Sequence, residues 1–321
     1  MGLPAVFENL SLPVVASPMF LVSGKELVMA TCRSGVVGTF PALNQRSSEG
    51  FEQWLEEIQA GLEGATQADG RPAAPFGVNL IVHKSNPRMQ ADLELCVKHE
   101  VPLVITSLGA VSELVDAVHS YGGLVFHDVT TVRHGEKAAE AGVDGLIAVC
   151  AGAGGHAGTL SPFALLPELR SFFDGTLLLS GCISSGNQIA AAQLLGADMA
   201  YMGSRFIATQ ESAASDVNKQ MVVAGHAKDI VYTPAISGVP GNFLRPSLEA
   251  AGLDPDNLPV KESISFNKES EPPEHGAKAW KNIWSAGQGI GSVHDIPTTA
   301  EFCGRLKTEY ELAVSGFLAN R

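Results

Sequence analysis

The sequence predicts a (β/α)8 barrel, also called a TIM barrel, with a small helical subdomain inserted after the eighth strand. Eight short runs rich in apolar and β-branched residues recur along the chain, and such continuous apolarity is typical of parallel strands covered on both faces. Amphipathic stretches with apolar residues at three- and four-residue steps lie between them. Eight successive strand–helix units are what a (β/α)8 barrel requires. An open doubly wound sheet is the alternative.

The predicted strands are residues 13–16, 35–40, 76–82, 102–107, 124–127, 145–150, 176–180 and 199–203. The clearest predicted helices are residues 51–62, 89–99, 111–121, 132–141 and 187–195. Residues 212–275 break this rhythm, are richer in Pro, Gly and charge, and are too many for a plain barrel loop. We therefore divide the chain into a barrel domain (1–211), a small substrate or lid subdomain (212–276) and a C-terminal return to the barrel (277–321).

The composition predicts a protein that acts on small molecules. The 321 residues, 45% hydrophobic and 17% charged, suffice for a large core. A formal net charge of -13 argues against a nucleic-acid or anionic-membrane surface as the partner. No apolar run could span a bilayer and no targeting segment is recognisable, so we expect a cytoplasmic protein. The five cysteines show no metal-ligand spacing, so no metal site is predicted.

One histidine lies within a run of glycines after the sixth predicted strand, in the stretch CAGAGGHAG at residues 150–158. Glycine lets a backbone approach a ligand closely, and an imidazole is a common acid, base or hydrogen-bond partner near neutral pH. The glycines match the dinucleotide fingerprint G-x-G-x-x-G/A, which requires a helix that begins within the glycines. In this sequence the better helix start is Ser161-Pro162, after the glycines. We interpret the stretch as a barrel loop against a flat ligand, with His156 directed at a substrate. The alternative is a tight turn in which His156 caps a carbonyl.

Two more glycine-containing loops follow the seventh and eighth predicted strands. They contain Ser180, Gly181 and Cys182, and Met202, Gly203 and Ser204. Loops at these places, near a helix N-terminus, form the usual phosphate site of (β/α)8 barrels, because backbone N–H groups and serine hydroxyls donate to phosphate oxygens. The two loops together predict a phosphate site, with plain turn formation as the alternative.

These stretches together resemble the nitronate monooxygenase family, formerly called 2-nitropropane dioxygenase. The resemblance is carried by ASPM from Ala16, FGVN from Phe76, VRHGEKAAEAGVDGLIAVCAGAGGH ending at His156, SGC from Ser180, GADMAYMGSRF ending at Phe206 and AGQG from Ala286. It covers nearly the whole chain in the right order, and the glycine–histidine stretch is its most specific part. It implies an FMN-dependent barrel enzyme that oxidises alkyl nitronates with O₂ to carbonyl compounds and nitrite.

The resemblance also implies roles for individual residues. The residues that would face or hydrogen-bond the flavin ring are Ser17, Pro18, Met19 and Asn79. The backbone of Gly154 and Gly155 would lie along the isoalloxazine or the ribityl chain. The residues that would hold or adjoin the FMN phosphate are Ser180, Gly181, Cys182, Met202, Gly203 and Ser204. His156 matches the active-site histidine of the family, which orients or deprotonates the substrate.

The sequence departs from the family pattern around the implied flavin and substrate. Ser17-Pro18 stands where members often have two glycines, Asp128 stands where some relatives have lysine, and Gly152 and Ala153 replace bulkier or acidic residues. FMN stays the expected cofactor. The substrate is left open, because some relatives use NAD(P)H to reduce quinones and a related group reduces enoyl thioesters on acyl carriers.

Four ionisable residues lie near the predicted mouth of the barrel. Asp128, counted here with the cofactor-binding residues, would either contact a ribityl hydroxyl and tune the flavin, or cap the turn into residues 129–131. His83 and Lys84 would offer positive charge to an anionic nitronate, with a solvated loop as the alternative for Lys84. Arg245 would serve as a lid cation.

Three functional hypotheses follow. The leading one is FMN-dependent oxidation of an alkyl nitronate, or of a nitroalkane, with His156 as hydrogen-bond donor or base. The second is an NAD(P)H-dependent quinone or enoyl-thioester reductase on the same scaffold. The third is a non-catalytic sensor of a phosphate-containing ligand.

Overall fold

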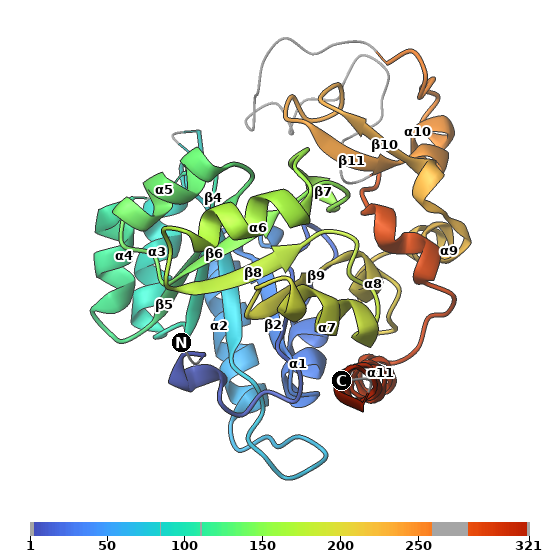
Figure 1. The fold of residues 1–321 in the computed structure, drawn as a ribbon. Helices are drawn as coiled ribbons and strands as arrows, with labels where there is room; N and C mark the ends of the chain where they lie inside the picture. Colours follow the sequence, from blue (N-terminus) through green and yellow to red (C-terminus); the bar gives the residue numbers. More distant parts are fainter. Residues whose placement is uncertain (1–2, 84, 110, 259–281, 320–321) are drawn as a thin grey trace.

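Eight parallel strands form a closed barrel at the centre of the molecule (Figure 1). The computed structural model describes residues 3–83, 85–109, 111–258 and 282–319. The barrel strands are β1 (Val14–Ala16), β2 (Val37–Pro41), β3 (Phe76–Ile81), β4 (Leu103–Ser107), β5 (Leu124–Val129), β6 (Gly145–Val149), β8 (Thr176–Ser180) and β9 (Met199–Met202). The last strand pairs with the first, with Val15 opposite Tyr201, which closes the sheet. The predicted (β/α)8 barrel is confirmed, and closure excludes the open doubly wound sheet.

The interior of the barrel is filled by apolar side chains. Ile105, Phe126 and Leu178 belong to one buried cluster of residues from alternate positions of the strands. Phe7, from the short helix η1 (Ala5–Phe7), adds its ring to this cluster at 5.9 Å from the ring of Phe126. The opposite faces of the strands belong to a larger cluster shared with the helices. Each strand is therefore covered on both faces, which explains its continuous apolarity.

Helices surround the barrel (Figure 1). They are α1 (Lys25–Arg33), η2 (Ala42–Asn44), α2 (Ser48–Leu62), α3 (Met89–Lys98), α4 (Ser112–His119), α5 (Val132–Glu140), α6 (Pro162–Arg170), α7 (Gly186–Leu194) and, after β9, α8 (Ser204–Ile207). Helix α6 begins at Pro162 after the N-cap Ser161, as predicted. The C-terminal helix α11 (Thr299–Ala319) packs against α7 and α1 and completes the outer layer. None of the described helices is long and apolar enough to cross a membrane.

The segment after the barrel strands combines helices with a small sheet. Its elements are α9 (Asp216–Ala224), η3 (Ala227–Asp229), β10 (Ile230–Thr233), β11 (Gly241–Leu244) and α10 (Arg245–Ala250). Strands β10 and β11 form an antiparallel sheet whose third strand is β7 (Gly155–His156). The expectation of a helical subdomain therefore misses this sheet, in which the glycine–histidine loop of the barrel is itself one strand. Part of the predicted subdomain, residues 259–276, lies outside the described residues.

From residue 282 the described chain lies against the barrel again. Residues 282–298 include η5 (Gln288–Ser292) and pack against α8 and α9. Arg205, at the start of α8, is buried with its guanidinium 4.2 Å from the ring of Phe302 on α11 and bonded to Asp295. These contacts fix the return segment beside the carboxyl ends of the barrel strands.

Candidate active site

The inward-facing side chains of the barrel change from apolar to polar toward the carboxyl ends of the strands. Two residues after Ile105 comes Ser107, and two residues after Phe126 comes Asp128. Because strand side chains alternate with a period of two, each polar residue lies on the same face as its apolar predecessor. Asn79, Ser180 and Tyr201 occupy equivalent places on β3, β8 and β9. The carboxyl end of the barrel is therefore a polar rim above an apolar core.

A cavity of about 1040 Å³ opens above this rim. The predicted residues that line it are Ser17, Pro18, Met19, Asn79, Asp128, Gly154, Gly155, His156, Ser180, Gly181, Cys182, Gly203 and Ser204. Met202 is the exception, because its side chain belongs to the outer apolar cluster between strands and helices. Its carbonyl oxygen accepts a hydrogen bond from the backbone N–H of Ser17, at 2.9 Å. The structure thus brings the predicted residues together from six different parts of the chain, apart from the side chain of Met202.

His156 is held by the small sheet that the sequence did not reveal. It lies opposite Gly241 in the β7–β11 ladder, after Gly155 with φ 72°. Its Nε2 lies 3.3 Å from Oγ of Ser237, whose hydroxyl donates to the carbonyl of Val239 at 3.0 Å. The Ser237 hydrogen is therefore used, and Nε2–H of His156 is the donor. Burial lowers the pKa of His156, so the imidazole is neutral near pH 7.

The two glycines predicted to lie along a flavin have different structural reasons. A Cβ on Gly154 would lie 2.9 Å from the backbone nitrogen of Gly287, so this glycine is required by packing against the return segment. Gly155 adopts a positive φ, and a Cβ there would meet no atom within 4 Å. Gly154 thus allows close packing within the protein, whereas Gly155 leaves open space in the cavity wall.

The two predicted phosphate loops line the same cavity and meet the return segment. Oγ of Ser204 accepts from the N–H of Gly287 at 2.7 Å, and the hydroxyl of Ser184 donates to the carbonyl of Gly289 at 3.0 Å. Cys182 has φ 57°, a left-handed conformation that costs a non-glycine residue about 1 kcal/mol or more. Such strain at a loop between two cavity-lining segments is typical of functional sites.

Asp128 ends a chain of oriented hydrogen bonds. The amide Nδ2 of Asn79 donates to the carbonyl of Ile105 at 3.1 Å and to Oγ of Ser107 at 2.8 Å. The hydroxyl of Ser107 then donates to Oδ2 of Asp128 at 2.6 Å. Oδ1 is buried and has no hydrogen-bond partner among the described residues. The carboxyl therefore bonds to Ser107. It does not cap the turn at residues 129–131, which was one of the two interpretations offered by the sequence.

The surroundings of Asp128 disfavour its charge. Burial raises its pKa to about 6, against the lowering effect of the Ser107 hydrogen bond. Tyr201, which also lines the cavity, is buried, and burial together with the nearby Asp128 raises the pKa of its phenol. The Tyr201 hydroxyl is therefore a neutral donor at physiological pH.

His83 and Arg245, the two predicted cations that the structure describes, do not line the cavity. His83 is not among the lining residues, and its Nδ1 lies 2.7 Å from Oγ of Ser85. Arg245 forms a bidentate ion pair with Asp256, at 3.0 and 2.8 Å, also outside the lining. Its interpretation as a lid cation is therefore wrong for this conformation, while Lys84 lies outside the described residues.

Four lining or supporting residues were missed by the sequence analysis: Ser107, Tyr201, Asn218 and Ser237. The period-two alternation along β4 and β9 would have placed Ser107 and Tyr201 on the inward face. Asn218 and Ser237 carry no such signal, because they lie outside the barrel strands, Asn218 on α9 and Ser237 in the loop between β10 and β11.

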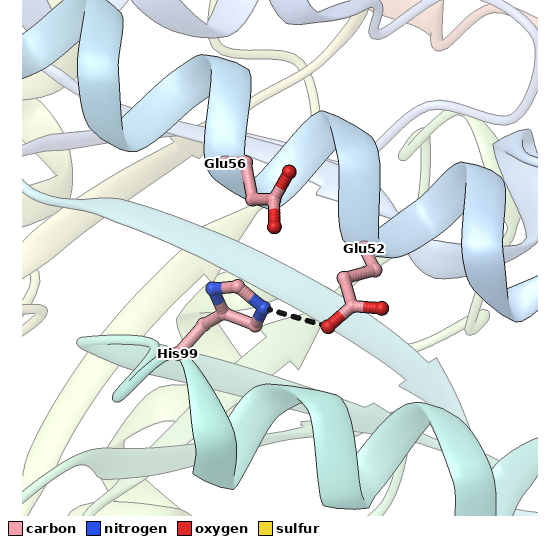
Figure 2. A group of neighbouring side chains, drawn as sticks. All are labelled: Glu52, Glu56 and His99. Carbon is pink, nitrogen blue, oxygen red and sulfur yellow. Dashed lines mark hydrogen bonds and ion pairs between the residues drawn. The ribbon is translucent and has the colours of Figure 1, made fainter.

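A separate group of side chains has the composition of a metal site. Figure 2 shows Glu52 and Glu56 on α2 with His99, which follows α3. Nε2 of His99 lies 3.3 Å from Oε1 of Glu52, and Lys98 bonds to the same oxygen at 2.5 Å. The second ring nitrogen of His99 lies 3.1 Å from Oε1 of Gln59. These neighbours account for the group as an ion-pair network that joins two helices of the barrel.

A (β/α)8 barrel with a polar rim, a large cavity and a half-buried histidine at its mouth is the architecture of an enzyme acting on a small molecule. A model of the nitronate monooxygenase family matches residues 5–309. The chain belongs to this family of oxidoreductases, whose members are flavoproteins. The hypothesis of a non-catalytic sensor is thereby set aside.

Individual relatives differ in their named activities. A nitronate monooxygenase of Paraburkholderia phytofirmans is 23% identical over 94% of this chain and 93% of its own. A protein of Rhodococcus jostii, named a 5-hydroxy-7a-methyl-1-oxo-octahydro-1H-indene-4-carboxyl-CoA dehydrogenase, is 28% identical over 74% of this chain and 63% of its own. Matches to the first curated relatives span less than two thirds of those proteins, between 60% and 64%. A nitroalkane oxidase structure from Streptomyces ansochromogenes superposes with a TM-score of 0.81 at 23% identity, covering 98% of this chain and 100% of its own.

Proposed function

We propose that this protein binds FMN and oxidises alkyl nitronates, or the parent nitroalkanes, with O₂ to a carbonyl compound and nitrite. The observation that carries the proposal is His156, held by β11 in the wall of a cavity whose floor is the polar rim of the barrel. Family membership supplies the class of reaction. His156 supplies an Nε2–H that bonds to Ser237 in this structure and would exchange that bond for one to a nitro or nitronate oxygen.

The residues around the cavity fit FMN. Serine hydroxyls and the backbone of Gly181 and Gly203 match the needs of a phosphate group. Asn79 and Ser17 offer polar contacts to a ring, and the open space at Gly155 lets a flat ligand lie against the backbone. Bound FMN would supply the electron transfer between the organic substrate and O₂. The protein contributes orientation, hydrogen bonds and exclusion of water.

His156 binds and orients the substrate in this account. Its neutral imidazole donates through Nε2 to Ser237, whose own hydroxyl is held by the carbonyl of Val239. A bound substrate would take the place of Ser237 as the acceptor of this hydrogen. A donor placed at a nitro oxygen stabilises the negative charge that develops there when the nitronate forms or reacts.

The test is a product assay on the purified, flavin-loaded protein. Wild type should form nitrite and consume O₂ with an alkyl nitronate, and His156→Asn should lower kcat/KM by about 100-fold, the usual cost of one such donor, with flavin still bound. His119→Asn, on the outer surface of α4, is the matched control and should keep full activity. Full activity of His156→Asn would remove the histidine from the mechanism.

A second candidate is an oxidoreductase of acyl thioesters or quinones that uses NAD(P)H. It is favoured by the size of the cavity, about 1040 Å³, which is at the upper end of small-molecule pockets. It is also favoured by the relatives named as CoA dehydrogenases. Rapid reduction of the flavin by NADH or NADPH, with no effect of nitronate, would establish this candidate instead.

A further inference from the structure

The carboxyl of Asp128 lines the cavity and is paired with no cation among the described residues, although Lys137 on α5 lines the same cavity. Its pKa is set by burial and by the Ser107 hydrogen bond, with no contribution from a cation. The residues around it are Ser107 on β4, Asn79 on β3 and Tyr201 on β9, and its neighbour His127 bonds away from it, to Thr106. A buried carboxylate without a counter-ion is costly, so its presence requires a reason.

The hydrogen bonds fix which oxygen of Asp128 can meet a ligand. Both hydrogens of Asn79 Nδ2 are used, so the Ser107 hydroxyl accepts from Asn79 and gives its single hydrogen to Oδ2 of Asp128. Oδ1 is sealed from solvent and unpartnered. Contact with a ligand is therefore made through Oδ2, which keeps a second lone pair. The unpartnered Oδ1 makes the charged form less stable and the carboxylate more basic.

We propose that Asp128 is the catalytic base that removes the α-proton of a neutral nitroalkane, with His156 as the donor to the nitro group. This inference rests on the proposed function and assigns its substrate class. In the step, the Cα–H bond breaks, its electron pair stays on the substrate as the nitronate, and the proton forms an O–H bond with Oδ2. No oxidant is needed for this step.

Charge complementarity supports a neutral substrate. At Oδ2 of Asp128 an anionic nitronate would be repelled, whereas a neutral nitroalkane would not. Lys137 also lines the cavity but lies outside this contact, because no cation contributes to the pKa of Asp128. Protonation of Asp128 in the step leaves a neutral acid beside the new anion. A carboxylate with a pKa of about 6 is well matched to proton transfer near neutral pH, and such catalysis is worth about 100- to 10,000-fold.

The experiment compares a neutral nitroalkane with its preformed nitronate on the flavin-loaded protein. With 2-nitropropane, Asp128→Asn should lower kcat/KM at least 100-fold, whereas turnover of propane-2-nitronate should stay within about threefold of wild type. Asp116→Asn, an exposed carboxylate on α4, is the matched control and should change neither. Equal loss with both substrates, or no loss with the nitroalkane, overturns the assignment.

A second readout does not depend on oxidation. In D₂O without O₂, the protein should catalyse exchange of the α-hydrogen of 2-nitropropane, followed by proton NMR, and Asp128→Asn should abolish this exchange. If wild type oxidises neither substrate, the proposed function fails, while exchange that depends on Asp128 still supports the base. Exchange that is unchanged in Asp128→Asn contradicts it.

Ser107→Ala tests the role of Asp128 through the pH dependence of turnover, which would not change if Asp128 had only a structural role. Loss of the Ser107 donor removes the interaction that lowers the pKa of Asp128, so the pH midpoint for nitroalkane turnover should rise, and the profile with preformed nitronate should not change. This variant also serves if Asp128→Asn fails to retain flavin. An unmoved midpoint overturns the inference.

Discussion

At the scale of single residues, the site contains two features that cost stability. Asp128 has a buried carboxyl with an unpartnered oxygen, and Cys182 has a left-handed backbone conformation. Both line the cavity and neither improves the stability of the barrel. Such features persist where the rest of the fold is stable enough to hold them.

The burial of Asp128 predicts a pH-dependent stability. Because its pKa is raised from 3.8 to about 6 in the folded state, its contribution to stability is complete below pH 3.8 and is lost as the pH rises through 6. Asp128→Asn should therefore raise the free energy of unfolding by about 3 kcal/mol at pH 8, and the gain should vanish near pH 4. Urea unfolding of the flavin-free protein at both pH values measures this difference in the free energy of unfolding. A variant less stable than wild type at pH 8 would show that the ionised carboxyl does not destabilise the fold.

The sequence placed residues in the cavity lining where a residue had a positional reason. Ser17 follows β1, and Asn79 and Asp128 lie near the carboxyl ends of β3 and β5, strands that are recognisable by their apolar runs and whose carboxyl ends converge in a barrel. Met202 was misjudged because a one-residue step along a strand moves a side chain to the other face. The positive φ of Cys182 is a tertiary feature with no local sequence signal.

At the scale of elements, the position of His156 depends on the pairing of β7 with β11. Strand β7 has two residues, Gly155 and His156, and lies in a glycine-rich loop, so no apolar alternation marks it. The barrel strands were predictable because each is buried on both faces. The small sheet was not predictable, because it depends on the tertiary pairing of β11 with the loop. The insertion was therefore expected to be helical, and α9 and α10 are only part of it.

Gly241→Ala tests this pairing. A Cβ at Gly241 would lie 2.8 Å from the carbonyl oxygen of Gly155, which is backbone and must shift. Because displacement of a catalytic group by about 1 Å can cost about 100-fold, we expect nitronate turnover to fall by about 10- to 100-fold with flavin retained. Gly304→Ala on α11, where a Cβ meets no atom within 4 Å, should leave turnover unchanged. Equal turnover in both variants would mean that the β7–β11 contact does not position His156.

At the scale of the whole molecule, the barrel supplies a rigid rim and the return segment seals one side of the cavity. Gln288 N–H donates to the carbonyl of Gly152 at 2.8 Å, and Gly155 N–H donates to Oγ of Ser285 at 2.6 Å. Residues more than a hundred positions apart thus form one wall. The closed barrel, its strand order and its C-terminal cavity follow from the apolar pattern, whereas this wall depends on the full tertiary fold.

The visible spectrum of the purified protein, mixed without O₂ with an alkyl nitronate and separately with NADH, tests the central claim most directly. The account predicts that the protein carries a flavin band, that the band changes rapidly with nitronate, and that it changes little with NADH. Reduction by NADH with no response to nitronate would contradict the claim and make this family member a reductase on the same scaffold.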